Sequence, residues 1–293
     1  MLEFRELTLS DKPWVDKLLA ESGFRGCEYC FANNLAWRRL NDTKITRYKD
    51  FYICCSGKDE PVFTFPAGKG DYADVFSEMR KYAESKGKPL VVSSVSDENI
   101  RIFEELYPGM VKVSADEGEF DYIYNSEDLI NLKGKKYHQK RNHLNNFYKN
   151  EWEFLPLTED LFDDCIEFAV NSYNDSNGYD TFSSVAEQFA IHTFFSSFHE
   201  LELMGGVLKA DGKLVGFTIG EKITSDTLGV HIEKALHDVQ GAYTAVNNEF
   251  AKLYGKDFTY MNREEDLGIE GLRKAKQSYY PAFLLRKNTV EIL

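Results

Sequence analysis

The sequence predicts an α+β protein with mixed α/β order, built from two copies of one fold in which a mixed, largely antiparallel sheet is flanked by helices. Residues 51–124 and 203–293 share one order of expected elements: antiparallel strands, helix, strand, helix, strand. A length of 293 residues with 43% apolar side chains suffices for two cores. We therefore expect domains at 1–125 and 151–293, joined by a basic connector helix at 126–150.

The N-terminal half opens with an expected strand at 2–9 and a helix at 10–23, which Ser10 or Asp11 can cap. A hairpin with the turn KDEP then follows, because two aromatic and β-branched runs flank it. The later elements expected in this half are a helix at 71–87, a strand at 89–95, a helix at 97–109 and an extended pair at 110–124.

The C-terminal half restarts with a strand and a helix at 152–173, followed by a helix at 183–201. Asp211-Gly212 between two apolar runs is a strong hairpin signal. The elements that follow are a strand at 227–234, a helix at 241–255, a strand at 258–262 and a helix at 268–280 that ends before Pro281.

Charge and hydropathy exclude several classes of function. The net charge of −13 opposes broad binding to nucleic acid or to an anionic membrane, although residues 133–141 hold five Lys or Arg. We expect no signal peptide and no integral membrane association, because the first residues are charged and no run approaches a membrane span. The expected location is cytoplasmic.

The five cysteines are odd in number and irregularly spaced, which fits a reducing compartment. Cys27 and Cys30 form a lone CxxC without a second pair, so no metal site is expected and buried thiols are the simpler interpretation.

Several motifs together resemble a known family. They are FDYIYNSEDLINLKGKKYHQKRNHLNNF at 120–147, VGFTIGEKI at 215–223, HIEKA at 231–235 and NREEDLGIEGLRKAKQSYYP at 262–281, together with the helix that carries Asn247 and Glu249. With the order of elements, they are similar to the family of phosphatidylglycerol lysyltransferase C-terminal domains, which pairs two GNAT-like acyltransferase domains. We expect no counterpart of that enzyme's membrane-spanning half within these 293 residues.

This resemblance implies transfer of an acyl or aminoacyl group to an amine or hydroxyl of a small-molecule acceptor. The donor would be acyl-CoA or aminoacyl-tRNA, so charged tRNA is an expected partner. The cleft would be formed mainly by the C-terminal domain. One alternative is a catalytically inactive GNAT-like protein that binds a small anionic or amino-acid-like ligand. Another is a module that handles tRNA, which the net charge opposes.

Four residues are the candidates for catalysis. His231 and Glu233 alternate onto one strand face and could act as a base or bind an ammonium group, or they could be a solvated face. Lys276 precedes Pro281 by five residues, which the resemblance matches to a lysine facing the aminoacyl ester, although surface lysines are common. Tyr280, or Tyr279 beside it, could protonate a leaving group or pack in the core.

The other candidates would bind substrate. Glu264 and Glu265 follow a strand end and could attract a cationic amino group or favour the next helix start. Lys136, Lys140, Arg141 and Asn142 could bind phosphates of CoA or of a tRNA end. Gln240 and Gly241 stand at the place of a pyrophosphate loop. Asn247 and Asn262 are the remaining candidates. A solvated linker helix would give the same basic pattern, and VQGAY holds one glycine where such a loop has two.

Overall fold

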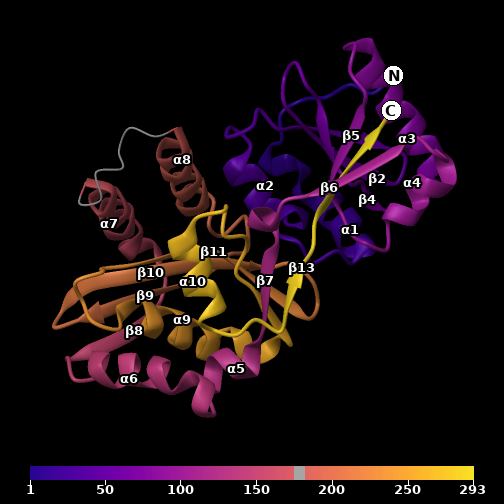
Figure 1. Ribbon diagram of the computed structural model, residues 1–293. Coiled ribbons are helices and arrows are strands. Elements are labelled where there is room, and N and C mark those ends of the chain that lie inside the picture. Colours follow the sequence, from indigo (N-terminus) through magenta and orange to yellow (C-terminus); the bar gives the residue numbers. More distant parts are fainter. Residues whose placement is uncertain (175–181) are drawn as a thin grey trace. The chain divides into compact units, whose positions relative to one another are not determined.

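The chain forms two compact units in a computed structural model that describes residues 1–174 and 182–293. The first unit comprises Met1–Asp121, Glu265–Leu272 and Leu284–Leu293, and the second comprises Tyr122–Glu264 and Arg273–Phe283. Each contains one seven-stranded mixed sheet with helices packed on it (Figure 1). The predicted fold class is thereby confirmed.

The sheet of the first unit has the order β1-β2-β3-β5-β14-β6, with β4 paired to β2. Its strands are β1 (Lys44–Tyr48), β2 (Phe51–Ser56), β3 (Val62–Thr64), β4 (Ala67–Gly68), β5 (Leu90–Val95), β6 (Val111–Ala115) and β14 (Asn288–Ile292). The helices of this unit are α1 (Lys12–Ser22), α2 (Phe31–Trp37), α3 (Tyr72–Ser85) and α4 (Ile100–Leu106).

Helix α3 shows how local sequence sets these elements. Asp71 caps it by accepting hydrogen bonds from the backbone N–H groups of Ala73 at 2.9 Å and Asp74 at 3.4 Å. Its apolar face, which includes Phe76 and Met79, is fully buried against the sheet core. The predicted helix at 71–87 is confirmed.

The last strand of the chain lies inside the first sheet. β14 pairs antiparallel with β5 on one side and with β6 on the other, and Val290 and Ile292 are buried in the first unit's core. Both edges of β14 are therefore hydrogen-bonded, which leaves no exposed backbone groups along it. The compact units differ for this reason from the expected linear domains, since 265–272 and 284–293 belong with the N-terminal residues.

The second sheet has the order β13-β7-β12-β11-β10-β9-β8. Its strands are β7 (Asp121–Asn125), β8 (Trp152–Pro156), β9 (Met204–Ala210), β10 (Lys213–Lys222), β11 (Thr227–Ala235), β12 (Tyr260–Asn262) and β13 (Phe283–Leu285). β11 and β12 run parallel, whereas β10 pairs antiparallel with β9 and β11. Asp211 and Gly212 both take positive φ in the β9–β10 turn, which confirms the predicted hairpin.

Helices cover both faces of the second sheet (Figure 1). α9 (Ala242–Leu253) packs on β9, β10 and β11, with α5 (Ser126–Asn131) and α6 (His138–Phe147) against it, while α7 (Phe162–Asn174) packs on β10 and α8 (Phe182–Ser196) on α7. The segment 126–150, expected as a connector, is therefore part of the second unit: Leu129, Leu144 and Phe147 are buried in its core. The remaining helix is α10 (Glu270–Gln277). None of the helices in residues 1–174 and 182–293 combines the length and the apolarity needed to span a membrane.

Some elements differ from the sequence expectation. Residues 2–9 were expected as a strand, but only Arg5 pairs, with Ile45, because the short η1 turn (Leu9–Asp11) begins the helical segment. β1 was not expected, and the single strand expected after the helix at 268–280 is two strands, β13 and β14, which belong to different sheets. β14 holds alternating buried residues, but the positions that pair with it lie almost two hundred residues earlier.

A buried lysine is surrounded by acids in the first unit. The Lys287 ammonium lies 2.5 Å from Glu28 Oε1 and 2.6 Å from Asp121 Oδ1, and it reaches Cys27 Sγ at 3.4 Å. Burial would lower the pKa of Lys287, but the charge of Asp121, with Cys27 and Glu28, raises it well above its usual value. The lysine therefore stays charged and neutralises carboxylates that have little access to water.

We expect Lys287→Met to lower the free energy of unfolding by about 3–5 kcal/mol, because the buried carboxylate of Asp121 loses its counter-ion. Urea titration followed by circular dichroism measures this loss. The matched control is Lys112→Met, whose surface ion pair with Glu291 is worth at most about 1 kcal/mol. Equal losses in the two variants would contradict a structural role for the buried pair.

Candidate functional site

Three elements of the second unit place polar side chains around Glu233. Glu233 lies near the end of β11, Arg263 directly follows β12, and Asn247 lies on α9. Arg263 Nη2 donates to Glu233 Oε1 at 2.7 Å, and Asn247 Nδ2 donates to Glu233 Oε2 at 2.9 Å. Because β11 and β12 are parallel neighbours, their carboxyl ends bring these residues to the same edge of the sheet. We call Glu233, Arg263 and Asn247 the Glu233 cluster.

Two atoms of the Glu233 cluster are buried without a hydrogen-bond partner among the described residues. They are Arg263 Nη1, a donor, and Asn247 Oδ1, an acceptor. The side chains of Arg263 and Glu233 are only 12% and 13% exposed, so bulk water reaches them poorly. Leaving such groups unpaired is costly, so the Glu233 cluster is a candidate functional site.

Lys140 on α6 lies beside the Glu233 cluster. Its Nζ is 3.7 Å from the ring centroid of Tyr279, and the Arg263 guanidinium carbon lies 4.8 Å from the same centroid. Burial lowers the pKa of Lys140 to about 8, helped by the charge of Arg263 and opposed by that of Glu233. A substantial fraction of Lys140 is therefore neutral near pH 8, so its amine can accept a proton.

Lys276 holds the backbone that carries Arg263. Its Nζ donates to the carbonyl oxygen of Arg263 at 2.5 Å, and the carbonyl oxygen of Lys276 accepts a hydrogen bond from Tyr124 at 2.7 Å. The predicted catalytic lysine is thus joined to the Glu233 cluster through a main-chain atom.

His231 forms a separate network, two residues before Glu233 on β11. Its Nδ1 lies 2.8 Å from Glu264 Oε1, its Nε2 lies 3.1 Å from Glu221 Oε1, and Phe194 stacks on the ring at 5.6 Å. Burial would lower the pKa of His231, but the hydrogen bonds of Glu221 and Glu264 raise it to about 10. A raised pKa favours the imidazolium form of His231 at neutral pH, with both ring nitrogens facing carboxylates.

The predicted acidic and amide residues separate between the two units. Asn262 is fully buried and accepts a hydrogen bond from the backbone N–H of Glu264 at 2.8 Å, which fixes the turn that offers Glu264 to His231. Glu265 belongs to the first unit, where its carboxylate lies 3.9 Å from the ammonium of Lys287. The two neighbouring glutamates therefore serve different networks.

The predicted phosphate-binding residues are mostly engaged elsewhere. Arg141 donates to the carbonyl oxygens of Leu132 and Gly134, and Lys136 lies 3.5 Å from Asp128. Asn142 is exposed and lies 3.3 Å from His138 Nε2, and Gln240 is also exposed.

Gly241 has a structural reason of its own to be glycine. Its φ is +86°, and a Cβ there would lie 2.2 Å from the carbonyl oxygen of His143. The glycine therefore permits the close packing of α9 on α6.

Tyr280 is 46% exposed and packs edge-on against Tyr137 at 5.5 Å, with Lys136 5.5 Å from its ring. The buried tyrosine beside the Glu233 cluster is Tyr279, whose pKa burial raises to about 12. The sequence analysis did not assign a role to Arg263, although it lies in the NREEDLG motif. The pattern that could have predicted a role for Arg263 is a single arginine that directly follows a strand and precedes three acids.

Comparison with known proteins gives the family to which the chain is related. Residues 19–289 match the family described as "Phosphatidylglycerol lysyltransferase, C-terminal". A solved structure of a conserved protein of unknown function from Bacteroides thetaiotaomicron is 34% identical, covers 100% of both chains and superimposes with a TM-score of 0.95.

More distant solved structures share the fold. L-PGS from Bacillus licheniformis is 14% identical over 96% of this chain and 92% of its own, with a TM-score of 0.65. A tandem GNAT protein from the clavulanic acid biosynthesis pathway is 12% identical over 99% and 98% of the two chains, with a TM-score of 0.52. An uncharacterised protein of Mycoplasmoides gallisepticum is 20% identical over 60% of this chain, which spans 58% of that protein's length.

We expect the ring of His231 to titrate near pH 10 in the folded protein, measured by NMR of its ring nitrogens, because two carboxylates hold its proton. A pKa raised above the ordinary 6.5 adds stability that is full below about pH 6.5 and is lost as the pH rises through about 10. Glu264→Gln should lower this midpoint. Loss of the signal in His231→Gln assigns it, and a wild-type midpoint near 6.5 would contradict the network.

Proposed function

The chain belongs to the phosphatidylglycerol lysyltransferase C-terminal family, and from that premise we propose that it is an aminoacyl transferase. The proposed reaction moves an aminoacyl group from charged tRNA to an amine or hydroxyl of a small-molecule acceptor at the Glu233 cluster. The family match and the similarity to a tandem GNAT fold support a relationship of this chain to acyl and aminoacyl transferase domains. The choice of donor and the roles of individual residues are our proposal.

One observation carries the proposal: the Glu233 cluster holds one buried unpaired donor, Arg263 Nη1, and one buried unpaired acceptor, Asn247 Oδ1. An aminoacyl ester offers the complement of both, since its carbonyl oxygen accepts and its α-ammonium donates. A simple acyl group such as acetyl offers only the carbonyl oxygen. The arrangement therefore favours an aminoacyl donor over acetyl-CoA.

The same residues supply the chemistry of acyl transfer. Attack on the ester carbonyl places negative charge on its oxygen, and the unpaired Nη1 of Arg263 would stabilise that oxyanion. Glu233 and Asn247 Oδ1 would receive the α-ammonium of the aminoacyl group. Lys140 would take the proton of the attacking amine or hydroxyl, because burial keeps part of its amine neutral near pH 8. When the ester bond breaks, the ribose oxygen of the tRNA would receive that proton from the Lys140 ammonium and leave as a hydroxyl.

Lys276 and His231 would act through other residues. Lys276 fixes the Arg263 carbonyl, and therefore the direction of the arginine that follows β12. His231 would hold Glu264, which follows Arg263 directly in the sequence. Lys136 lies 3.5 Å from Asp128 and against the rings of Tyr137 and Tyr280, but it is 44% exposed and could exchange this ion pair for a phosphate of the donor's 3′ end.

We expect Arg263→Gln to reduce turnover by about 100-fold or more, because the oxyanion loses its donor. The assay follows label from mixed radioactive aminoacyl-tRNAs, and in parallel from acetyl-CoA, to hydroxylamine as a surrogate acceptor. Transfer from acetyl-CoA alone would contradict the aminoacyl donor. Transfer from neither donor would favour the alternative, an inactive protein that binds an amino-acid-like ligand.

A second variant separates catalysis from stability. Arg263→Gln alone leaves Glu233 buried without its counter-ion, which can destabilise the unit. The double variant Glu233→Gln with Arg263→Gln removes both charges and should melt close to the wild type while remaining inactive. A double variant that keeps full turnover would exclude the Glu233 cluster as the site.

We expect kcat/KM to rise with pH through a midpoint near 8, since the neutral amine of Lys140 is the proton acceptor. Lys140→Met should remove this rise of kcat/KM with pH and lower the rate. Lys149 is an exposed lysine near the end of the same helix, and Lys149→Met should keep the rise. A midpoint that persists in Lys140→Met would assign the titration to another group.

A further inference from the structure

Strand β6 forms an open edge of the first unit's sheet. It pairs with β14 on one side, and no described strand pairs with it on the other (Figure 1). Four of its five residues are exposed. β6 belongs to the first unit and carries none of the residues of the proposed transferase site.

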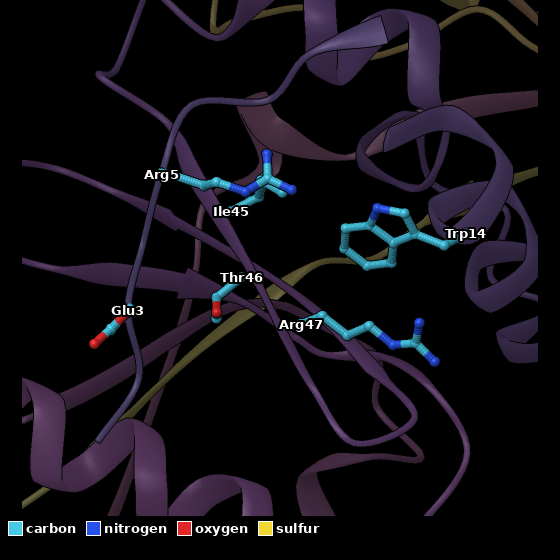
Figure 2. Close-up of a pocket in the computed structure, with 6 residues that line it drawn as sticks. All are labelled: Glu3, Arg5, Trp14, Ile45, Thr46 and Arg47. Carbon is cyan, nitrogen blue, oxygen red and sulfur yellow. The ribbon is translucent and has the colours of Figure 1, made fainter. Parts of the chain in front are cut away.

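The other three strands that end a sheet in the described chain have features that discourage further pairing. Arg5 and Ile45 exchange both backbone hydrogen bonds along β1, at 3.0 and 2.8 Å, and side chains of the first segment and of α1 stand beside this edge (Figure 2). β8 ends in Pro156, which has no N–H to donate, and β13 is only three residues long. β6 has neither a proline nor a covering strand within the described chain.

Alternate residues of β6 direct their backbone groups to the open edge. The Leu293 N–H donates to the carbonyl oxygen of Met110 at 2.9 Å, in register with the β6–β14 ladder. Backbone groups alternate between the two sides of an antiparallel strand, so every second residue after Met110 faces β14. The residues whose N–H and C=O face outward are Val111, Val113 and Ala115. These outward groups make no hydrogen bond with any other described residue.

The side chains of the outward-facing residues lie on the apolar face of the sheet. Val113 stands opposite Val290 in the ladder, and Val111 stands opposite Ile292. Both partners are buried in the first unit's core. Val113 itself is 42% exposed, because the sheet ends beside it. A further strand paired with β6 would remove this apolar surface from water, which stabilises such pairing.

We propose that β6 pairs antiparallel with β6 of a second copy of this chain, about a two-fold axis at Val113. Val113 then pairs with its own counterpart, and Val111 pairs with Ala115 of the second copy. This single register satisfies the backbone groups of all three outward-facing residues, because each of them meets another outward-facing residue. It also brings the valines of the two apolar faces together.

The charges along β6 favour a second copy over an unrelated extended peptide. In the proposed register, Lys112 lies opposite Ser114 of the second copy and diagonal to its Asp116, which is exposed. No two like charges stand directly opposite each other along the strand. The charged and the apolar side chains of β6 are therefore both self-complementary.

Sedimentation equilibrium of the full chain tests the proposal. We expect a reversible dimer with a Kd between about 1 and 100 µM, the range of a small edge-to-edge interface. Val113→Lys and Val113→Glu each place like charges on the two-fold axis, so each variant alone should be a folded monomer. An equimolar mixture of the two should dimerise again, because lysine then faces glutamate. A wild-type chain that stays monomeric up to about 500 µM would overturn the proposal. A mixture that stays monomeric, with both variants folded by circular dichroism, would also overturn it.

Single introduced cysteines test the register. The two copies of Val113→Cys would have Cα atoms about 5.5 Å apart, within reach of a disulfide, so mild oxidation should give a covalent dimer. Ala115→Cys is the matched control, because Ala115 is also exposed and lies on the same face of β6. Its two copies would lie about 14 Å apart and should not cross-link. The five native cysteines are buried, so the introduced thiol is the accessible one. Equal yields of covalent dimer from the two variants would sink the assignment.

Discussion

The buried ion pair between Glu233 and Arg263 is the interaction on which the candidate site depends. Its two members come from the ends of β11 and β12, so the parallel pairing of those strands brings them within 2.7 Å. Neither charge could be buried alone, because an isolated charge in a poorly hydrated place costs several kcal/mol. The pair also leaves one guanidinium nitrogen unsatisfied, which a purely structural ion pair would be expected to avoid.

The two units handle buried charge differently. In the first unit, Lys287 has close oxygen partners at 2.5 and 2.6 Å, and its ammonium fills the space between the acids. In the second unit, Lys140 faces the ring of Tyr279 and feels the like charge of Arg263. The first arrangement stabilises the charged form, and the second destabilises it. That contrast separates a lysine that holds the fold from one that can exchange a proton.

The sequence predicted most of the fold because the relevant signals are local. The Asp211-Gly212 turn, the capped helix after Asp71 and the alternation of β11 each need only a short window. The insertion of β14 between β5 and β6 depends on pairing with strands far earlier in the chain, which no local pattern contains. Glu233 was predicted from the alternation of its strand, and Asn247 came from the family resemblance. Arg263 was passed over because acids surround it in sequence.

His231 and Lys140 show why residue type alone does not assign a base. Histidine has the suitable ordinary pKa, yet two carboxylates hold its proton up to about pH 10. Lysine has an unsuitable ordinary pKa, yet burial beside Arg263 brings that of Lys140 to about 8. The side chain able to accept a proton near neutral pH is therefore the one that lies on the same tyrosine ring as Arg263. Lys140 and Arg263, which our proposal assigns as base and oxyanion donor, both lie against the ring of Tyr279.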